Sequence, residues 1–284
     1  MATKKKTTKK NSVATTSSNT AVAEVMDYGD LAGQGYENVE AGDYAIPFLN
    51  LIQDNSPQCK KAHDKYMDDA EEGMYLNSAS NELYKEGVYL VPVHIDHCYV
   101  EWGKEKEGGG FIARHELNSP FVAQVRQACE DPRNLETDKT ELNETYYLYA
   151  LVLNGPEDTD SSDTVVLSFS RTKIKKFRNM MTMMRKVKGK PPLFANRLYF
   201  THCTEVNKAG KTFANYTIEP ALTGRMEDSM IPRYIDGVQN PLIDAALALK
   251  DAVSTGSAQA DHAAASGKGS SAGSGGEGEV ERPF

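Results

Sequence analysis

The sequence is short of the features that mark secreted, membrane-spanning and disulfide-stabilised proteins. Its four cysteines, Cys59, Cys98, Cys129 and Cys203, form no CxxC pair, which argues against a disulfide scaffold and a cysteine-rich zinc finger. No apolar run approaches the length of a membrane-spanning helix. No apolar segment follows the lysines near the N-terminus, as a signal peptide would require. We therefore expect a soluble protein with reduced thiols in the cytoplasm.

Catalytic signatures are also missing. The chain has no nucleophile elbow, Walker A loop, HExxH or GxGxxG motif, and its carboxylates form no recognisable acid–base pair. His94, His97 and Cys98, with His202 and Cys203, could be drawn together as a zinc site, but tetrahedral zinc needs convergent ligands that this spacing does not supply. We expect no metal, no cofactor and no enzymatic activity.

The chain has an excess of acidic residues, with a formal net charge of −8. Taken alone, this balance argues against a nucleic-acid partner. The distribution is uneven, however, because basic residues gather in the first twenty residues and again between Arg171 and Lys190. Since the field at a groove depends on local clusters more than on the total, an anionic partner remains compatible with the sequence.

Both ends of the chain have the composition of disordered segments. Residues 1–20 contain five lysines and no acid, and we assign residues 1–42 to a disordered basic N-terminal arm. Residues 254–276 are almost entirely Gly, Ser and Ala, so residues 253–284 are expected to form a flexible linker followed by an acidic tip. The folded domain is predicted at residues 43–252.

The folded part is predicted to be mostly β with minor α. Residues 87–102 give the strongest strand signal, in which Pro92 predicts a bulge or an edge. Hairpins are predicted within residues 73–84, 146–169 and 197–220, a partner strand at 111–115, and helices at 120–130, 172–187 and 241–252. With about seven short strands and a helix between the middle and last hairpins, we expect an OB-like antiparallel β-barrel with an inserted basic helix.

The helix predicted at residues 172–187 carries the main candidate binding surface. Its apolar residues recur at helical spacing, so its charges must face solvent. Like charges repel on one helix face, which indicates an anionic partner, although a merely solvated helix is the alternative. The segment contains no acid and nine cationic residues, which are Arg171, Lys173, Lys175, Lys176, Arg178, Arg185, Lys186, Lys188 and Lys190.

Aromatic residues on the predicted strands are candidates for stacking on nucleic-acid bases, because base stacking needs exposed rings beside cations. We select Tyr99, Trp102, Tyr147 and Tyr199. Since strand residues alternate between faces, either Tyr146 or Tyr147 is expected to face outward. Ordinary core packing is the alternative for each ring.

The last eight residues, Glu-Gly-Glu-Val-Glu-Arg-Pro-Phe, combine acids with a proline and an aromatic residue. They resemble the C-terminal tip of bacterial single-stranded DNA-binding proteins, which recruits replication and repair enzymes. The sequence departs from that pattern by using Glu in place of Asp and by placing Arg282 among the acids. The resemblance implies a partner-binding set of Glu277, Glu279, Glu281, Pro283 and Phe284.

The body of the chain has a second resemblance, carried by I-P-F-L-N-L-I-Q-D-N-S-P-Q at 46–58, V-P-V and E-W within 91–102, and the glycine run at 108–110. These segments look like a family of bacteriophage-encoded proteins that are mostly uncharacterised. The resemblance implies a phage origin and no known catalytic residues.

Together these features predict a phage protein that binds single-stranded DNA without sequence specificity during replication or recombination. Its tail would recruit replication proteins in the host bacterial cytoplasm, with no membrane partner. A structural or assembly protein of the virion and a strand-annealing recombination protein are the alternatives. Whether the chain forms a homo-oligomer is left open.

Overall fold

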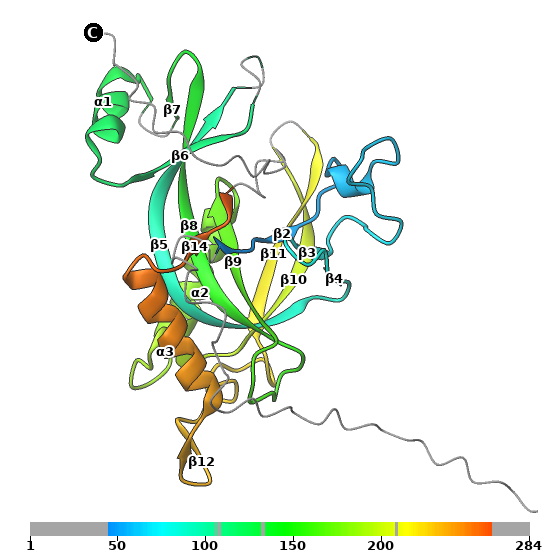
Figure 1. The fold of residues 1–284 in the computed structure, drawn as a ribbon, viewed down its shortest axis with the longest axis vertical. Helices are drawn as coiled ribbons and strands as arrows, with labels where there is room; N and C mark the ends of the chain where they lie inside the picture. The colour runs from blue at the N-terminus through cyan, green and yellow to red at the C-terminus, as the bar shows by residue number, and fades with distance from the viewer. Residues whose placement is uncertain (1–44, 105, 107–108, 132–133, 208–209, 263–284) are drawn as a thin grey trace, which may run out of the picture. The chain divides into compact units, whose positions relative to one another are not determined.

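Two long antiparallel strands, β5 (Val88–Gly103) and β8 (Thr140–Leu153), form the centre of the fold (Figure 1). The computed structural model describes residues 45–262, except 105, 107–108, 132–133 and 208–209. Because β5 and β8 are longer than their neighbours, each pairs with different strands along its length. The other members of this seven-stranded sheet are β6 (Phe111–Glu116), β7 (Leu135–Glu136), β9 (Asp163–Ser170), β10 (Leu198–Val206) and β11 (Thr212–Pro220).

The prediction of a mostly β, antiparallel fold is confirmed, but the OB-like closed barrel is not found. In the described part of the chain, the sheet runs from β11 through β10, β5 and β8, with β9 on the far side of β8. Barrel closure would require β9 to pair with β11, and these two strands share no ladder in the described residues. The sheet is therefore open.

The gap between β9 and β11 is bridged by the segment that contains β1 (Ala45–Ile46) and β2 (Leu49–Leu51). On one side, the Val166 amide donates to the Pro47 carbonyl at 2.8 Å. On the other side, the Gln53 side-chain amide donates to the Ala214 carbonyl and accepts from the Ala214 N–H, both at 3.0 Å. β2 also pairs with β3 (Tyr75–Asn77), which pairs with β4 (Leu83–Tyr84).

Helices cover both faces of the sheet. Residues of β8 alternate between the faces, so Leu148 and Ala150 pack in the cluster that contains α2 (Lys173–Arg185). Tyr147 and Tyr149 pack in the cluster that contains α3 (Pro241–Ser254). A sheet with two buried faces reads as a continuous apolar run, which explains the Y-Y-L-Y-A-L-V-L sequence of β8.

The remaining helix, α1 (Pro120–Ala128), lies at the end of the sheet beside β6 and β7 (Figure 1). Its first turn is fixed by Ser119, whose hydroxyl accepts a hydrogen bond from the Val122 amide at 3.2 Å, and by proline at its first position. α3 begins in the same way, because Asn240 accepts from Leu242 at 3.1 Å and Pro241 follows. Short 3₁₀ turns lie at Pro57–Cys59 and Leu193–Ala195.

The predicted hairpins and the bulge in β5 are confirmed, since the β5–β8 register shifts between Pro92 and His94. The sequence reading missed a hairpin formed by β12 (Tyr234–Ile235) and β13 (Val238–Gln239). It also placed the start of the linker at residue 253, where the structure has the end of α3 and then β14 (Gln259–Ala260), which pairs with β1. The predicted arm and tip, residues 1–42 and 277–284, lie outside the described residues.

Candidate nucleic-acid interface

α2 and the turn that follows it present a basic surface, which we call the basic face. The helix buries Phe177, Met180 and Met184 against the sheet, so its charged residues point outward. Counting Arg171, which precedes the helix, the basic face has nine cationic residues, of which seven are exposed and two, Lys173 and Lys176, are partly buried. The members are those predicted, namely Arg171, Lys173, Lys175, Lys176, Arg178, Arg185, Lys186, Lys188 and Lys190.

Three of these cations pair with a carboxylate or lie over an aromatic ring of the protein. Arg171 pairs with Glu141, and Lys176 pairs with Glu205 at 2.8 Å. The Lys173 ammonium lies 4.7 Å from the centre of the Tyr216 ring. In the described residues, no carboxylate lies within ion-pair distance of the other six, which are Lys175, Arg178, Arg185, Lys186, Lys188 and Lys190.

The Lys176–Glu205 pair is held by charge and by hydrogen bonds. The hydrogen bond from Lys176 lowers the pKa of Glu205, and Asn215 donates a second bond to the same carboxylate at 2.7 Å. Burial opposes the charge of Lys176, but its contacts with Glu205 and Cys203 raise the pKa of the ammonium above its ordinary value. Lys176 is therefore already neutralised and is a weaker candidate for phosphate binding than its neighbours.

A stack of three rings lies beside α2 on the same face of the sheet. The His97 ring of β5 stacks on Tyr146 of β8, with ring centres 3.9 Å apart and planes 14° apart. Tyr146 in turn stacks on Phe177 of α2 at 4.3 Å. Phe177 is buried, whereas the His97 side chain keeps 31% of its surface exposed. The stack thus has one end in the core and one end open to solvent.

Polar partners hold this stack in place. Glu144 contacts both the His97 Nε2 atom at 3.0 Å and the Tyr146 hydroxyl at 3.2 Å. Burial raises the pKa of Tyr146, and Arg178 of the basic face partly offsets that increase. Tyr99 lies two residues from His97 on β5, and Arg126 of α1 donates to its hydroxyl at 3.0 Å. Partly buried rings therefore lie between Arg126 of α1 and Arg178 of α2.

Of the four aromatic residues selected from the sequence, only Tyr99 lies on this face. Tyr147 is 3% exposed in the α3-side cluster, so the expectation that its ring is available for stacking is not met. Trp102 packs edge-on against Phe111 at 6.1 Å in the same cluster. Tyr199 stacks on Tyr89 at 4.4 Å, and strand alternation puts both rings on the face opposite α2.

The residues that sequence reasoning missed are His97 and Tyr146 of the stack and Arg126 of α1. Strand alternation predicted that either Tyr146 or Tyr147 faces outward. In the structure Tyr147 is buried in the α3-side cluster, whereas Tyr146 is partly exposed beside α2. His97 had been considered only as a zinc ligand. No sequence signal links Arg126 to Tyr99, because 27 positions separate them.

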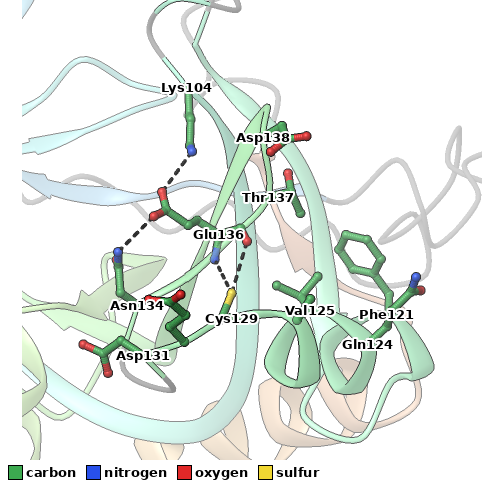
Figure 2. Close-up of a pocket in the computed structure, with 12 residues that line it drawn as sticks. Lys104, Phe121, Gln124, Val125, Cys129, Asp131, Asn134, Glu136, Thr137 and Asp138 are labelled. Carbon is green, nitrogen blue, oxygen red and sulfur yellow. Dashed lines mark hydrogen bonds and ion pairs between the residues drawn. The ribbon is translucent and has the colours of Figure 1, made fainter.

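A hollow beside α1, at the Gly103 end of β5, has a different charge. A pocket of about 680 Å³ lies between α1 and β7 (Figure 2). Acidic residues on its wall include Glu130, Glu136 and Asp138, and Lys104 pairs with Glu136 at 2.9 Å. The Cys129 sulfur exchanges hydrogen bonds with the Glu136 backbone at 3.2 and 3.3 Å (Figure 2). This acid-lined wall does not suit a phosphate backbone.

The candidate zinc ligands are spread over different surroundings. In the described ranges, no three His, Cys, Asp or Glu side chains converge as metal ligands. Cys98 is buried on the α3 side, where burial raises the pKa of its thiol to about 12. His94 lies on the wall of another hollow, and its pKa is lowered by burial. No described helix is long and apolar enough to cross a membrane.

The fold and this surface define a class of protein with a helix-covered β-sheet, a basic helix and an adjoining ring stack. A family model described as Pam3 phage gp34-like protein matches residues 13–257, so the chain belongs to the Pam3 phage gp34-like family. This family membership supports the predicted phage origin. No curated protein and no solved structure matches the chain.

Proposed function

We propose that the protein binds single-stranded DNA without sequence specificity, through the basic face and the His97–Tyr146 stack. The observation that carries this proposal is a set of six cations without carboxylate partners, in the described residues, on and just after the helix whose Phe177 forms one end of a ring stack. Phosphates neutralised by these cations would release counterions, and this supplies affinity for any sequence.

The ring stack favours a single strand over a duplex. A base can stack on the exposed His97 ring only when its own face is free, and a duplex hides both faces of every internal base. Each stacked base contributes about 1–3 kcal/mol in proteins of this kind, whichever base it is. A protein of a phage family with these properties would act during DNA replication or recombination in the infected bacterial cell.

Fluorescence anisotropy with labelled single-stranded and duplex DNA of equal length tests the proposal. We expect tighter binding to the single strand, similar affinity for different sequences, and a steep loss of affinity as salt rises. Equal or tighter binding to the duplex would contradict the proposal.

The tip is proposed as a separate, partner-binding element. Glu277, Glu279 and Glu281 with Pro283 and Phe284 offer acids and one aromatic anchor to a basic, apolar pocket on a replication protein. Deleting residues 278–284 should leave DNA binding intact and remove the partner. Recovery of the same proteins from infected cells with intact and Phe284→Ala bait would reject this role.

A different surface favours the alternative of an assembly or strand-annealing protein. Tyr234 and Val238 of the β12–β13 hairpin and Leu247 of α3 are large apolar residues that are 53%, 70% and 41% exposed. Leu247 lines an apolar pocket of about 750 Å³ together with Phe194 and with Gln239 of the same hairpin. Exposed apolar patches of this kind mark protein contacts. Light scattering of the full chain with and without single-stranded DNA would show whether copies associate.

A further inference from the structure

A hollow borders the C-terminal end of α2. Its volume is about 410 Å³, within the range of small-molecule sites. Met181 and Met184 of α2, with Pro191 and Leu193, form apolar walls, and Arg185 and Lys190 stand on its edge. Methionine and leucine side chains adapt readily to a flat ligand. The hollow therefore combines an apolar interior with two cations of the basic face.

Asn196 adds a buried polar group to the same wall. It is 1% exposed, and its Nδ2 atom donates to the carbonyls of Pro192 at 3.2 Å and Leu193 at 2.9 Å. These two acceptors fix the orientation of the amide, because only the nitrogen can donate. Its Oδ1 atom has no hydrogen-bond partner among the described residues. A buried acceptor without a donor costs about 1–3 kcal/mol, so the wall of the hollow contains a polar defect that the fold tolerates.

The turn that carries Lys190 contains two consecutive residues with positive φ angles. Gly189 and Lys190 have φ angles of +86° and +48°, and the Lys190 amide donates to the Val187 carbonyl at 3.2 Å. A lysine rarely adopts a positive φ, because its Cβ crowds the backbone there. Backbone strain of this kind is found preferentially where a side chain must be held in place for function.

We propose that this hollow holds one nucleotide of the bound strand. The base enters between Met181 and Leu193, and its phosphate pairs with Arg185 and Lys190. Apolar walls can contact the face of any base, so the site accepts all four. This inference rests on the proposed single-stranded DNA binding and gives it a position along α2.

Mononucleotides provide the first test. The full chain, labelled with ¹³C at its methionine methyl groups, is titrated with dAMP, dCMP, dGMP and dTMP, and separately with deoxyribose 5-phosphate, which lacks a base. Met181→Leu and Met184→Leu variants assign the two signals. We expect each mononucleotide to shift the Met181 and Met184 signals, and the base-free phosphate to leave them in place. Equal shifts with and without a base would reduce the hollow to a phosphate site and overturn the inference.

A filled pocket provides the second test. Met181→Trp places a large ring in the hollow, while Thr182→Trp adds the same ring to the exposed surface next to it. Losing one bound base should weaken single-stranded DNA binding by about 5- to 150-fold in Met181→Trp. Thr182→Trp should bind as the unmodified protein does, and circular dichroism checks that both variants are folded.

A matched pair of lysine variants tests the charge at the edge of the hollow without changing a buried residue. Lys190→Asn keeps a residue that tolerates positive φ and removes the charge, and Lys186→Asn removes one charge outside the hollow. Only Lys190→Asn should weaken the mononucleotide-induced methyl shifts.

The two proposals fail in different ways. Tight single-stranded DNA binding that is unchanged in Met181→Trp, without mononucleotide shifts, overturns the nucleotide pocket and leaves the basic face as the binding surface. Absence of single-stranded DNA binding by the unmodified protein overturns the proposed function, and the nucleotide pocket with it.

Discussion

α2 and α3 perform the same packing task on opposite faces of one sheet, yet their outer surfaces differ. Both bury an apolar stripe, formed by Phe177, Met180 and Met184 in α2 and by Leu242, Ala246 and Leu249 among others in α3. α2 carries five cationic residues and no acid within Lys173–Arg185. α3 carries Asp244, Lys250 and Asp251 within Pro241–Ser254.

The difference between the two helices shows which features of α2 are explained by packing against the sheet and which are not. α3 shows that an apolar stripe with a sparse, mixed-charge exterior is enough to cover this sheet. The acid-free exterior of α2 is therefore not explained by packing, and like charges on one helix destabilise it slightly. The DNA proposed above would neutralise these charges, and the following predictions test the contrast between the two helices.

The largest effect is expected from reversing charges on α2. Lys175→Glu, Arg178→Glu and Lys186→Glu together should weaken single-stranded DNA binding by at least about 100-fold and reduce the salt slope by about 2, since each lost phosphate contact removes about 0.7 from the slope. Anisotropy at several salt concentrations measures both quantities. The same reversal at Lys60, Lys61 and Lys65, which lie on a loop away from α2, changes the net charge equally and should have little effect.

A smaller effect is expected from the ring stack. His97→Ala removes the solvent-exposed ring and should weaken single-stranded DNA binding by about 10-fold, near the lower end of the stacking range because imidazole is small. Tyr199→Ala, which removes a ring on the opposite face, serves as the control. If both variants lose affinity equally, the strand does not follow the α2 face.

Releasing Lys176 should act in the opposite direction. Glu205→Gln removes the carboxylate that pairs with this lysine and frees one more cation on the basic face. Affinity for single-stranded DNA should rise by about 2- to 3-fold, and the salt slope should steepen by about 0.7. Glu219→Gln on the same strand pair, with no ion pair in the described residues, controls for the change in net charge. An unchanged salt slope in Glu205→Gln would place Lys176 outside the interface.

The smallest effect concerns the α3 side, where two histidines lie on the wall of one hollow. Burial lowers the pKa of both His94 and His262 below the ordinary 6.5. Asp96 raises the His94 pKa and Lys250 lowers it, and both effects are weaker than burial. The unfolded chain therefore binds more protons than the folded one, so stability is complete above pH 6.5 and falls as the pH decreases through that value.

Thermal unfolding between pH 7.5 and pH 5.5 measures this effect. We expect the Tm to fall by a few degrees over this interval. A His94→Gln, His262→Gln double variant should show a shallower decrease. An equal decrease in the double variant would assign the pH dependence to other groups.

Local patterns in the sequence were enough to predict the elements of the fold. The continuous apolar run in residues 146–153 and the helical spacing of Phe177 and Met180 are properties of short segments, and both predictions are confirmed. The β12–β13 hairpin also had a local signal, because Asp236-Gly237 adopts positive φ at both positions, as a two-residue hairpin turn requires. That signal was overlooked.

Closure of the sheet and the composition of the ring stack could not be predicted in this way. The open sheet depends on contacts such as Gln53 with Ala214, which are 161 positions apart. The placement of Tyr146 beside His97 depends on the bulge after Pro92, which sets the register between β5 and β8. The exposed cations of α2 were predicted as a set, but their pairing with Glu141 and Glu205 arises from strands distant in sequence.

The contact between Gln53 and Ala214 has a consequence for how copies of the protein can meet. β11 is an outer strand, and an outer strand with free backbone groups is a template for adding strands from other molecules. At Ala214 both backbone groups are already occupied by a side chain that imitates a peptide unit. A foreign strand would have to displace Gln53 before it could pair along this edge. The side chain of Gln53 therefore removes Ala214 as a starting point for strand addition along β11.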